Sequence, residues 1–136
     1  MFPIKNAREP DSLWRHLHPR KQMKWEWSDD GDDAVADMWH LMKRLSSCRE
    51  VVYSKWYQGR ATFFSREVFT ALLRLGADEK GLSPNARRIL STLRMDSPLS
   101  SRELKRATDL SGKFNERDYN RATRELFGRF LIVGFG

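Results

Sequence analysis

The feature that most constrains the fold of this chain is a run of three helix-start signals between residues 83 and 136. Ser83-Pro84 offers a hydroxyl that can accept from an unpaired backbone N–H, followed by a proline suited to the first helical position. Ser100 and Glu103 have the spacing of a capping box. Asn115 can cap a third helix in the same way. These signals predict three short helices in succession.

Each predicted helix has apolar residues at helical spacing, which gives it one face to bury. The apolar positions are Ala86, Ile89, Leu90 and Leu93 in the first helix, Leu104 and Ala107 in the second, and Tyr119, Ala122, Leu126 and Phe130 in the third. Leu99 with Leu104, and Phe114 with Tyr119, have the spacing of a hydrophobic staple. The apolar segment Leu131-Ile132-Val133 then predicts a short strand.

Three helices followed by a strand have the order of a winged helix-turn-helix module, which we assign to residues 81–136. For residues 1–80 the sequence predicts a small α+β part with helices and short strands. A degenerate second winged helix is the alternative for this half. The fold class expected for the whole chain is mostly α with short β strands. The polar, glycine-containing loop over residues 77–82 is the expected boundary between the halves.

The signals in the first half are weaker. Leu13, Trp14 and Leu17 predict a short helix that ends near Pro19, and alternating residues over 20–27 predict a short strand containing Trp25 and Trp27. The two tryptophans suit anchoring on a core, with stacking on bases as the alternative.

Further along, acidic residues 29–33 suit the start of a helix better than a calcium loop, because the glycine and glutamate of such a loop are out of register. The apolar stripe of that helix is Val35, Met38, Trp39, Met42 and Leu45. Residues 61–64 predict a strand, whereas 51–53 suit a strand or the tail of a helix. Residues 65–76 predict another helix, whose inward residues are Val68, Phe69, Leu72, Leu73 and Leu75.

The third helix of the last segment carries a basic stripe. Its apolar residues lie within about 60° of Tyr119, whereas Arg117, Arg121 and Arg124 lie about 140° to 200° away from it. Helix-turn-helix proteins place their recognition helix at this position. The predicted DNA-contact residues are Arg117, Arg121, Arg124, Lys113 and Asn120. An ordinary solvated face is the alternative, because the same helix also carries acidic residues.

Charge agrees with this prediction. The chain has a formal net charge of +7, and residues 83–136 contribute 11 basic and 6 acidic side chains. Double-stranded DNA is the expected partner, with an anionic membrane surface as the alternative. The lone Cys48 excludes an intrachain disulfide and a cysteine-based zinc site, and no metal or cofactor is expected. No apolar run is long enough to span a membrane and no signal peptide is evident, so the cytoplasm is the expected location.

The final strand raises a question of pairing, because a winged helix normally returns through a second wing strand. That strand is missing, since the sequence ends at Gly136. An unpaired apolar edge promotes association. We therefore expect the last strand to pair with residues 61–64 or with a second copy of the chain, or the natural gene product to continue further.

Four segments together resemble the AlkZ-like winged-helix proteins, which are related to bacterial alkyl- and crosslink-repair DNA glycosylases. The segments are Pro10-Asp11-Ser12-Leu13-Trp14, Gly59-Arg60-Ala61-Thr62-Phe63-Phe64-Ser65, Pro98-Leu99-Ser100-Ser101-Arg102-Glu103-Leu104 and Phe130-Leu131-Ile132-Val133-Gly134. The resemblance implies tandem winged-helix modules, DNA binding and, in the enzymatic members, base excision. Their catalytic motif is glutamine, any residue, then glutamine or aspartate. Neither Gln22, followed by Met23-Lys24, nor Gln58, followed by Gly59-Arg60, matches it.

The sequence therefore predicts a non-enzymatic DNA-binding protein that is regulatory or associated with DNA repair, with no catalytic residue assigned. Two alternatives stay open. One is a glycosylase-like repair enzyme or fragment that uses a different carboxylate, and the other is a winged helix used for protein contacts through its tryptophan-rich first half.

Overall fold

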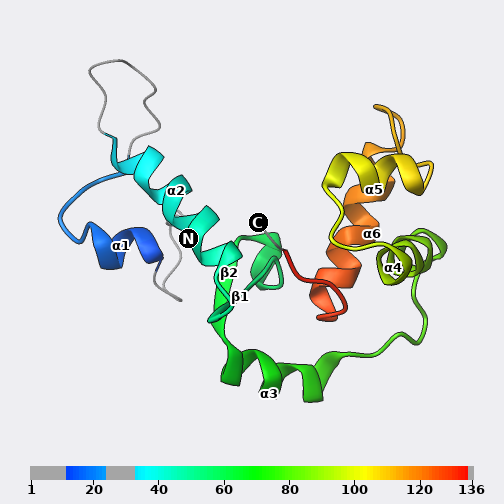
Figure 1. The fold of residues 1–136 in the computed structure, drawn as a ribbon, viewed down its shortest axis with the longest axis horizontal. Coiled ribbons are helices and arrows are strands. Elements are labelled where there is room, and N and C mark those ends of the chain that lie inside the picture. Colours follow the sequence, from blue (N-terminus) through cyan, green and yellow to red (C-terminus); the bar gives the residue numbers. More distant parts are fainter. Residues whose placement is uncertain (1–11, 24–32, 135–136) are drawn as a thin grey trace.

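The computed structural model describes residues 12–23 and 33–134, which form helices and one two-stranded antiparallel sheet (Figure 1). The elements are α1 (Leu13–Leu17), α2 (Ala34–Ser47), β1 (Val51–Ser54), the 3-10 helix η1 (Tyr57–Gly59), β2 (Thr62–Ser65), α3 (Arg66–Gly76), α4 (Pro84–Met95), α5 (Ser101–Ala107) and α6 (Glu116–Gly128). The prediction of a mostly helical chain with short strands is confirmed. None of the helices in these described ranges is long and apolar enough to cross a membrane.

The N-terminal elements form a small core of their own. The Ser12 hydroxyl caps α1 by accepting from the backbone N–H of Arg15, and Trp14 on α1 is buried. Trp14 packs with Val35 and Met38 of α2. Trp39, predicted to lie on the same apolar stripe, is instead 41% exposed. The prediction fails there because α1 covers only part of α2.

Residues 20–23 of the strand predicted over 20–27 form no strand, and the other predictions for residues 20–32 fall outside the described part of the chain. Those outside are the tryptophans Trp25 and Trp27 and the acidic residues 29–32. Asp33 precedes α2 without forming a side-chain cap.

The two strands form a hairpin in the middle of the chain. β1 and β2 pair antiparallel, with Val51 opposite Ser65 and Ser54 opposite Thr62. The strand predicted over 61–64 is confirmed, and the ambiguous segment 51–53 proves to be its partner. The Ser65 hydroxyl, at the end of β2, then accepts from the Val68 N–H and caps α3.

Helix α3 buries less than its sequence pattern predicts. Phe69 is buried and Leu72 is half-buried, but Val68 is 51% exposed and Leu75 is 85% exposed. In Figure 1, α3 lies apart from α4, α5 and α6, so only the side that faces the hairpin and the C-terminal segment is covered. The prediction that Val68, Leu73 and Leu75 pack inward is therefore wrong.

Helices α4, α5 and α6 form the larger core, and two of the predicted caps are confirmed. The Ser83 hydroxyl accepts from the Ala86 N–H at 3.3 Å. Ser100 and Glu103 form the capping box, since the Ser100 N–H donates to the Glu103 carboxylate at 2.8 Å and the Glu103 N–H donates to the Ser100 hydroxyl at 3.3 Å. The core of this unit consists of Leu82, Ala86, Ile89, Leu90, Leu104, Leu110, Tyr119, Ala122 and Leu126.

Three local predictions in this unit are wrong. Asn115 precedes α6 but does not cap it, because its amide donates to the Ser111 carbonyl at 2.9 Å. Phe114 forms no staple with Tyr119 and is 98% exposed. Ala107 is exposed, and Thr108 is buried in its place, with its hydroxyl donating to the Leu104 carbonyl at 2.6 Å.

The C-terminal segment after α6 follows a different path from the one predicted. Among the described residues, Leu131 to Val133 form no strand, and Leu131 and Ile132 pack against the core of α4, α5 and α6. The segment then reaches the hairpin, where the Gly134 N–H donates to the Tyr53 carbonyl at 2.9 Å in a single antiparallel bridge. Its partner is thus β1 and not residues 61–64. Figure 1 shows this segment running from α6 back to the hairpin.

Phe130 joins the two halves of the chain. Its ring stacks on Trp56 at 5.3 Å between centroids and meets Phe69 edge-on at 5.7 Å and Phe64 edge-on at 6.4 Å. Gly76 lies so close that an added Cβ would stand 3.3 Å from the Phe130 ring. Phe130 itself has a positive φ of 54°, which costs a non-glycine residue about 1–2 kcal/mol. The burial of its ring offsets that strain.

We expect Phe130→Ala to lower the free energy of unfolding by about 3–5 kcal/mol, because it leaves a cavity between α3, the hairpin and α6. Urea denaturation followed by circular dichroism measures this loss. The control is Phe114→Ala, which removes the same atoms from a fully exposed position and should change stability by less than about 0.5 kcal/mol. Equal effects of the two substitutions would contradict the role of Phe130.

The capping box also predicts a pH dependence. The pKa of Glu103 lies below its ordinary value. The largest cause is a hydrogen bond with the Ser100 hydroxyl, and the second is a hydrogen bond from the Ser100 backbone N–H. The stability that Glu103 adds is therefore fully present above the ordinary glutamate pKa and is lost as the pH falls through the lowered one. Glu103→Gln should weaken the protein near pH 7 and have a smaller effect near pH 3, as measured by urea denaturation at both values.

The matched control for this prediction is Glu103→Gln in a Ser100→Ala background. With the hydroxyl removed, the substitution should show a smaller change with pH, because the main cause of the lowered pKa is absent. An effect of Glu103→Gln that is equal at both pH values would contradict the assignment.

Candidate nucleic-acid interface

Helix α6 separates an apolar side from a basic side, as its sequence predicts. Tyr119, Ala122 and Leu126 are buried against α4 and α5, whereas Arg117, Arg121 and Arg124 are exposed. The separation results from helical periodicity, since the three arginines recur at spacings of three or four residues. The arginine stripe, defined as Arg117, Arg121 and Arg124, therefore lies on the surface.

The basic residues of the C-terminal unit, which α4, α5 and α6 form, differ in whether they have an internal partner. Arg88 donates to the Thr108 carbonyl at 3.0 Å, Arg94 pairs with Glu79, and Arg129 donates to the Lys80 carbonyl at 2.5 Å. Within the described residues, no hydrogen bond or ion pair engages Arg117, Arg121 or Arg124. Their guanidinium groups are available for a ligand.

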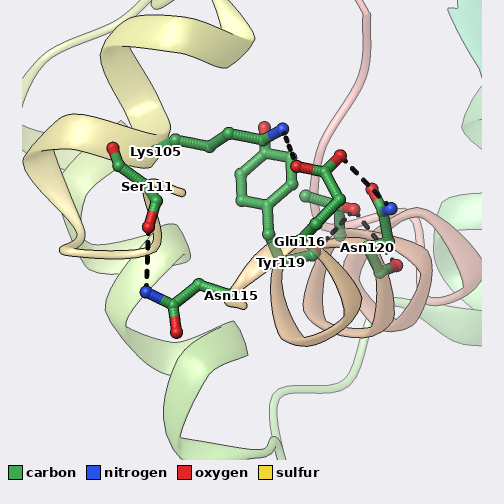
Figure 2. Close-up of polar contacts among 7 residues, drawn as sticks. Lys105, Ser111, Asn115, Glu116, Tyr119 and Asn120 are labelled. Carbon is green, nitrogen blue, oxygen red and sulfur yellow. Dashed lines mark hydrogen bonds and ion pairs between the residues drawn. The ribbon is translucent and has the colours of Figure 1, made fainter. Parts of the chain in front are cut away.

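The first turn of α6 is fixed to α5 by one ion pair. The Lys105 ammonium lies 2.6 Å from the Glu116 carboxylate and 4.7 Å from the centre of the Tyr119 ring, a cation–π distance. Figure 2 shows the Lys105 side chain extending from α5 past the Tyr119 ring to Glu116. The hydrogen bond from Lys105 holds the pKa of Glu116 below its ordinary value, so this carboxylate is ionised and already neutralised by its partner.

The turn before α6 is held by the side chain that was expected to cap the helix. The Asn115 amide donates to the Ser111 carbonyl (Figure 2), and the Asn115 N–H donates to the Gly112 carbonyl at 3.2 Å. Gly112 has a φ of +91°, a region that suits glycine because it has no Cβ. Lys113 lies in this turn and is exposed.

A cleft of about 1180 Å³ lies between the C-terminal unit and the hairpin. Tyr53 and Lys55 line it from β1 and the residue after it, because alternate residues of a strand face the same side. Arg94, Lys105 and Arg124 add positive charge from α4, α5 and α6. Burial raises the pKa of the Tyr53 phenol, so that side chain lines the cleft as a neutral group.

The cleft divides the predicted DNA-contact residues into two groups. Asn120 and Arg124 line it, whereas Arg117, Arg121 and Lys113 lie outside it. Asn120 is exposed, and its amide lies 3.5 Å from the Glu116 carboxylate. We define the outer face of α6 by Lys113, Arg117 and Arg121.

Sequence reasoning missed the basic residues that line the cleft from other elements. Lys55, Arg94 and Lys105 belong to three separate segments, and no local pattern brings them together. A partial signal was available for Lys105, because a lysine on the second helix of a helix-turn-helix can reach the first turn of the third.

The candidate chemical groups that line the cleft include a glutamine and a carboxylate. Gln58, one of the two glutamines considered for a catalytic motif, does line it, at a φ of 51°. The carboxylate of Glu116 is already paired with Lys105. Within the described ranges, no three histidine, cysteine, aspartate or glutamate side chains gather as metal ligands. The thiol of Cys48 is half-buried and lies 3.3 Å from the Leu45 carbonyl.

The comparisons with known proteins agree with the resemblance in the sequence. A family model described as AlkZ related matches residues 1–136. Searches of the curated proteins and of the solved structures gave no match. Because the match extends over the full length given, this chain belongs to the AlkZ-related family.

Proposed function

We propose that this protein is a non-enzymatic, repair-associated protein that binds double-stranded DNA through α6, with α4, α5 and α6 serving as the helical part of a winged-helix module. The observation that carries the proposal is the set of exposed arginines on α6 that have no partner among the described residues. Membership of the AlkZ-related family supports a repair context.

Arginine is the side chain expected for this role. Its planar guanidinium can pair with two oxygens of a phosphate or with the two major-groove acceptors of guanine. In helix-turn-helix proteins, the N-terminal part of the recognition helix reaches the base edges. Arg117 and Arg121 occupy this part of α6, and Lys113 precedes it. Arg124, one turn further along and at the cleft, suits a phosphate contact.

The start of α6 adds a second source of attraction for phosphate. Asn115 uses its side chain to bind Ser111, so it leaves the first backbone N–H groups of α6 without a side-chain cap. A helix start carries partial positive charge, and its free N–H groups favour an anion. Of the two carboxylates in this first turn, Glu116 is paired with Lys105, whereas Asp118 has no partner among the described residues and opposes the attraction.

The chemistry of the cleft supports binding in preference to base excision. Excision requires a positioned acid or base beside a flipped base. The carboxylate on the described cleft wall is Glu116, which is ionised and occupied by Lys105. The glutamine motif of the enzymatic relatives is absent around Gln58.

The proposal predicts that Arg121→Ala weakens binding to a random duplex of about 20 base pairs and lowers the salt slope by about one unit. Each phosphate contact releases bound counterions, so the loss of one contact reduces the dependence of the binding constant on salt. Fluorescence anisotropy over about 50 to 200 mM salt measures both quantities.

Arg74→Ala is the matched control, because Arg74 is an exposed arginine near the end of α3, away from α6. It removes the same charge and should leave the salt slope unchanged. Equal behaviour of the two variants would show that net charge alone, and not α6, determines binding. An Arg121→Ala variant with wild-type affinity and slope would refute the recognition-helix assignment.

A further inference from the structure

Phe114 is the most exposed large apolar side chain in the described part of the protein. It is 98% exposed, compared with 86% for Met95 and 85% for Leu75. A single exposed apolar residue is ordinary on a protein surface. Phe114 differs by its position, since it follows Lys113 directly and precedes Arg117 by three residues at the start of α6. An aromatic ring thus stands within the outer face of α6.

The surrounding contacts explain why the ring remains in solvent. A staple would place Phe114 against Tyr119, but the ammonium of Lys105 lies over the Tyr119 ring at 4.7 Å. The same ammonium is held by Glu116 at 2.6 Å. Figure 2 shows this arrangement of Lys105, Glu116 and Tyr119. The face of the Tyr119 ring that Lys105 covers is therefore not available to Phe114.

The turn that carries Phe114 is fixed independently of the ring. The Asn115 amide donates to the carbonyls of Ser111 at 2.9 Å and Asp109 at 3.4 Å. The Asn115 N–H adds a bond to the Gly112 carbonyl. A ring on a turn that is already ordered loses little freedom when it binds, so more of its contact energy contributes to affinity.

Resting on the proposed function, we propose that Phe114 stacks on an unpaired base, so that this protein prefers duplex DNA that contains an unstacked nucleotide. Lys113 and Arg117 hold the phosphates beside that nucleotide. The Phe114 ring then covers the face of the base that the duplex leaves open.

The sizes of two opposing effects decide whether the protein prefers an intact or an interrupted duplex. Stacking one base on an aromatic side chain strengthens binding by about 5-fold to 100-fold. Wedging an apolar side chain into a regular duplex first requires unstacking a base step, at a cost of similar size. The two effects nearly cancel in an intact duplex. Where a nucleotide is already unstacked, the unstacking cost is absent and the stacking gain remains. The protein then binds the interrupted duplex more tightly than the intact one.

The test uses the full chain and two probes, an intact duplex of about 20 base pairs and the same duplex with one extra, bulged adenine at the centre of one strand. Fluorescence anisotropy gives the Kd for each. Wild type should bind the bulged probe about 5-fold to 100-fold more tightly. Phe114→Ala should abolish this preference and leave the Kd and salt slope for intact duplex unchanged. Phe114→Trp should retain it.

Leu75→Ala is the matched control, because Leu75 is another exposed apolar residue and lies on α3. It should keep the wild-type preference. Anionic phospholipid vesicles form a further arm, since an aromatic ring between cations also suits a membrane surface. A Phe114→Ala variant that loses vesicle binding while its preference for the bulged probe is unchanged would overturn the inference in favour of a membrane.

The remaining outcomes separate this inference from the proposed function. Equal affinity of wild type for the two probes, or a preference that survives Phe114→Ala, overturns the role of Phe114. If Arg121→Ala still lowers the salt slope in that case, duplex binding through α6 stands. Absence of salt-dependent binding to either probe overturns the proposed function and this inference together.

Discussion

The arrangement of the two halves depends on the burial of the Phe130 ring. Phe130 follows α6, while its neighbours Trp56, Phe64 and Phe69 come from the hairpin region and α3. The backbone adopts a left-handed conformation to place the ring there. Because the cleft is bounded by α6 on one side and by β1 and η1 on the other, the same contact sets how far apart its walls stand.

Internal pairing decides which charges of the C-terminal unit can act on a partner. Glu116 and Glu125 of this unit, and Glu79 of the loop before it, are each matched by a basic side chain of the unit. These pairs consume cations that a count of charges would assign to a ligand. What remains on α6 is a smaller set, and it lies in the exposed stripe. Net charge therefore overstates the number of cations that are free to act on a partner.

The sequence predicted the parts of the fold that depend on neighbours within one turn. The Ser83 cap and the Ser100–Glu103 box are of this kind, because each joins two residues that are three positions apart. The prediction that Asn115 caps α6 is wrong because the turn brings the Ser111 carbonyl close enough to compete for the Asn115 side chain. The predicted staple between Phe114 and Tyr119 does not form, and Lys105 from another helix covers the Tyr119 ring. The cleft could not be predicted from the sequence, because the residues that line it come from segments far apart in the chain.

The crossing of Gly134 over Tyr53 has a consequence for how the sequence can vary. A Cβ at position 134 would stand 2.0 Å from one ring atom of Tyr53 and 2.3 Å from another. The ring is held in turn by Phe63, at 5.4 Å between centroids. A side chain at position 134 is therefore expected to require a smaller residue at position 53, or a displacement of the C-terminal segment away from β1. The C-terminal segment can cross β1 this closely because position 134 has no side chain, so the ring at position 53 limits which residues fit at position 134.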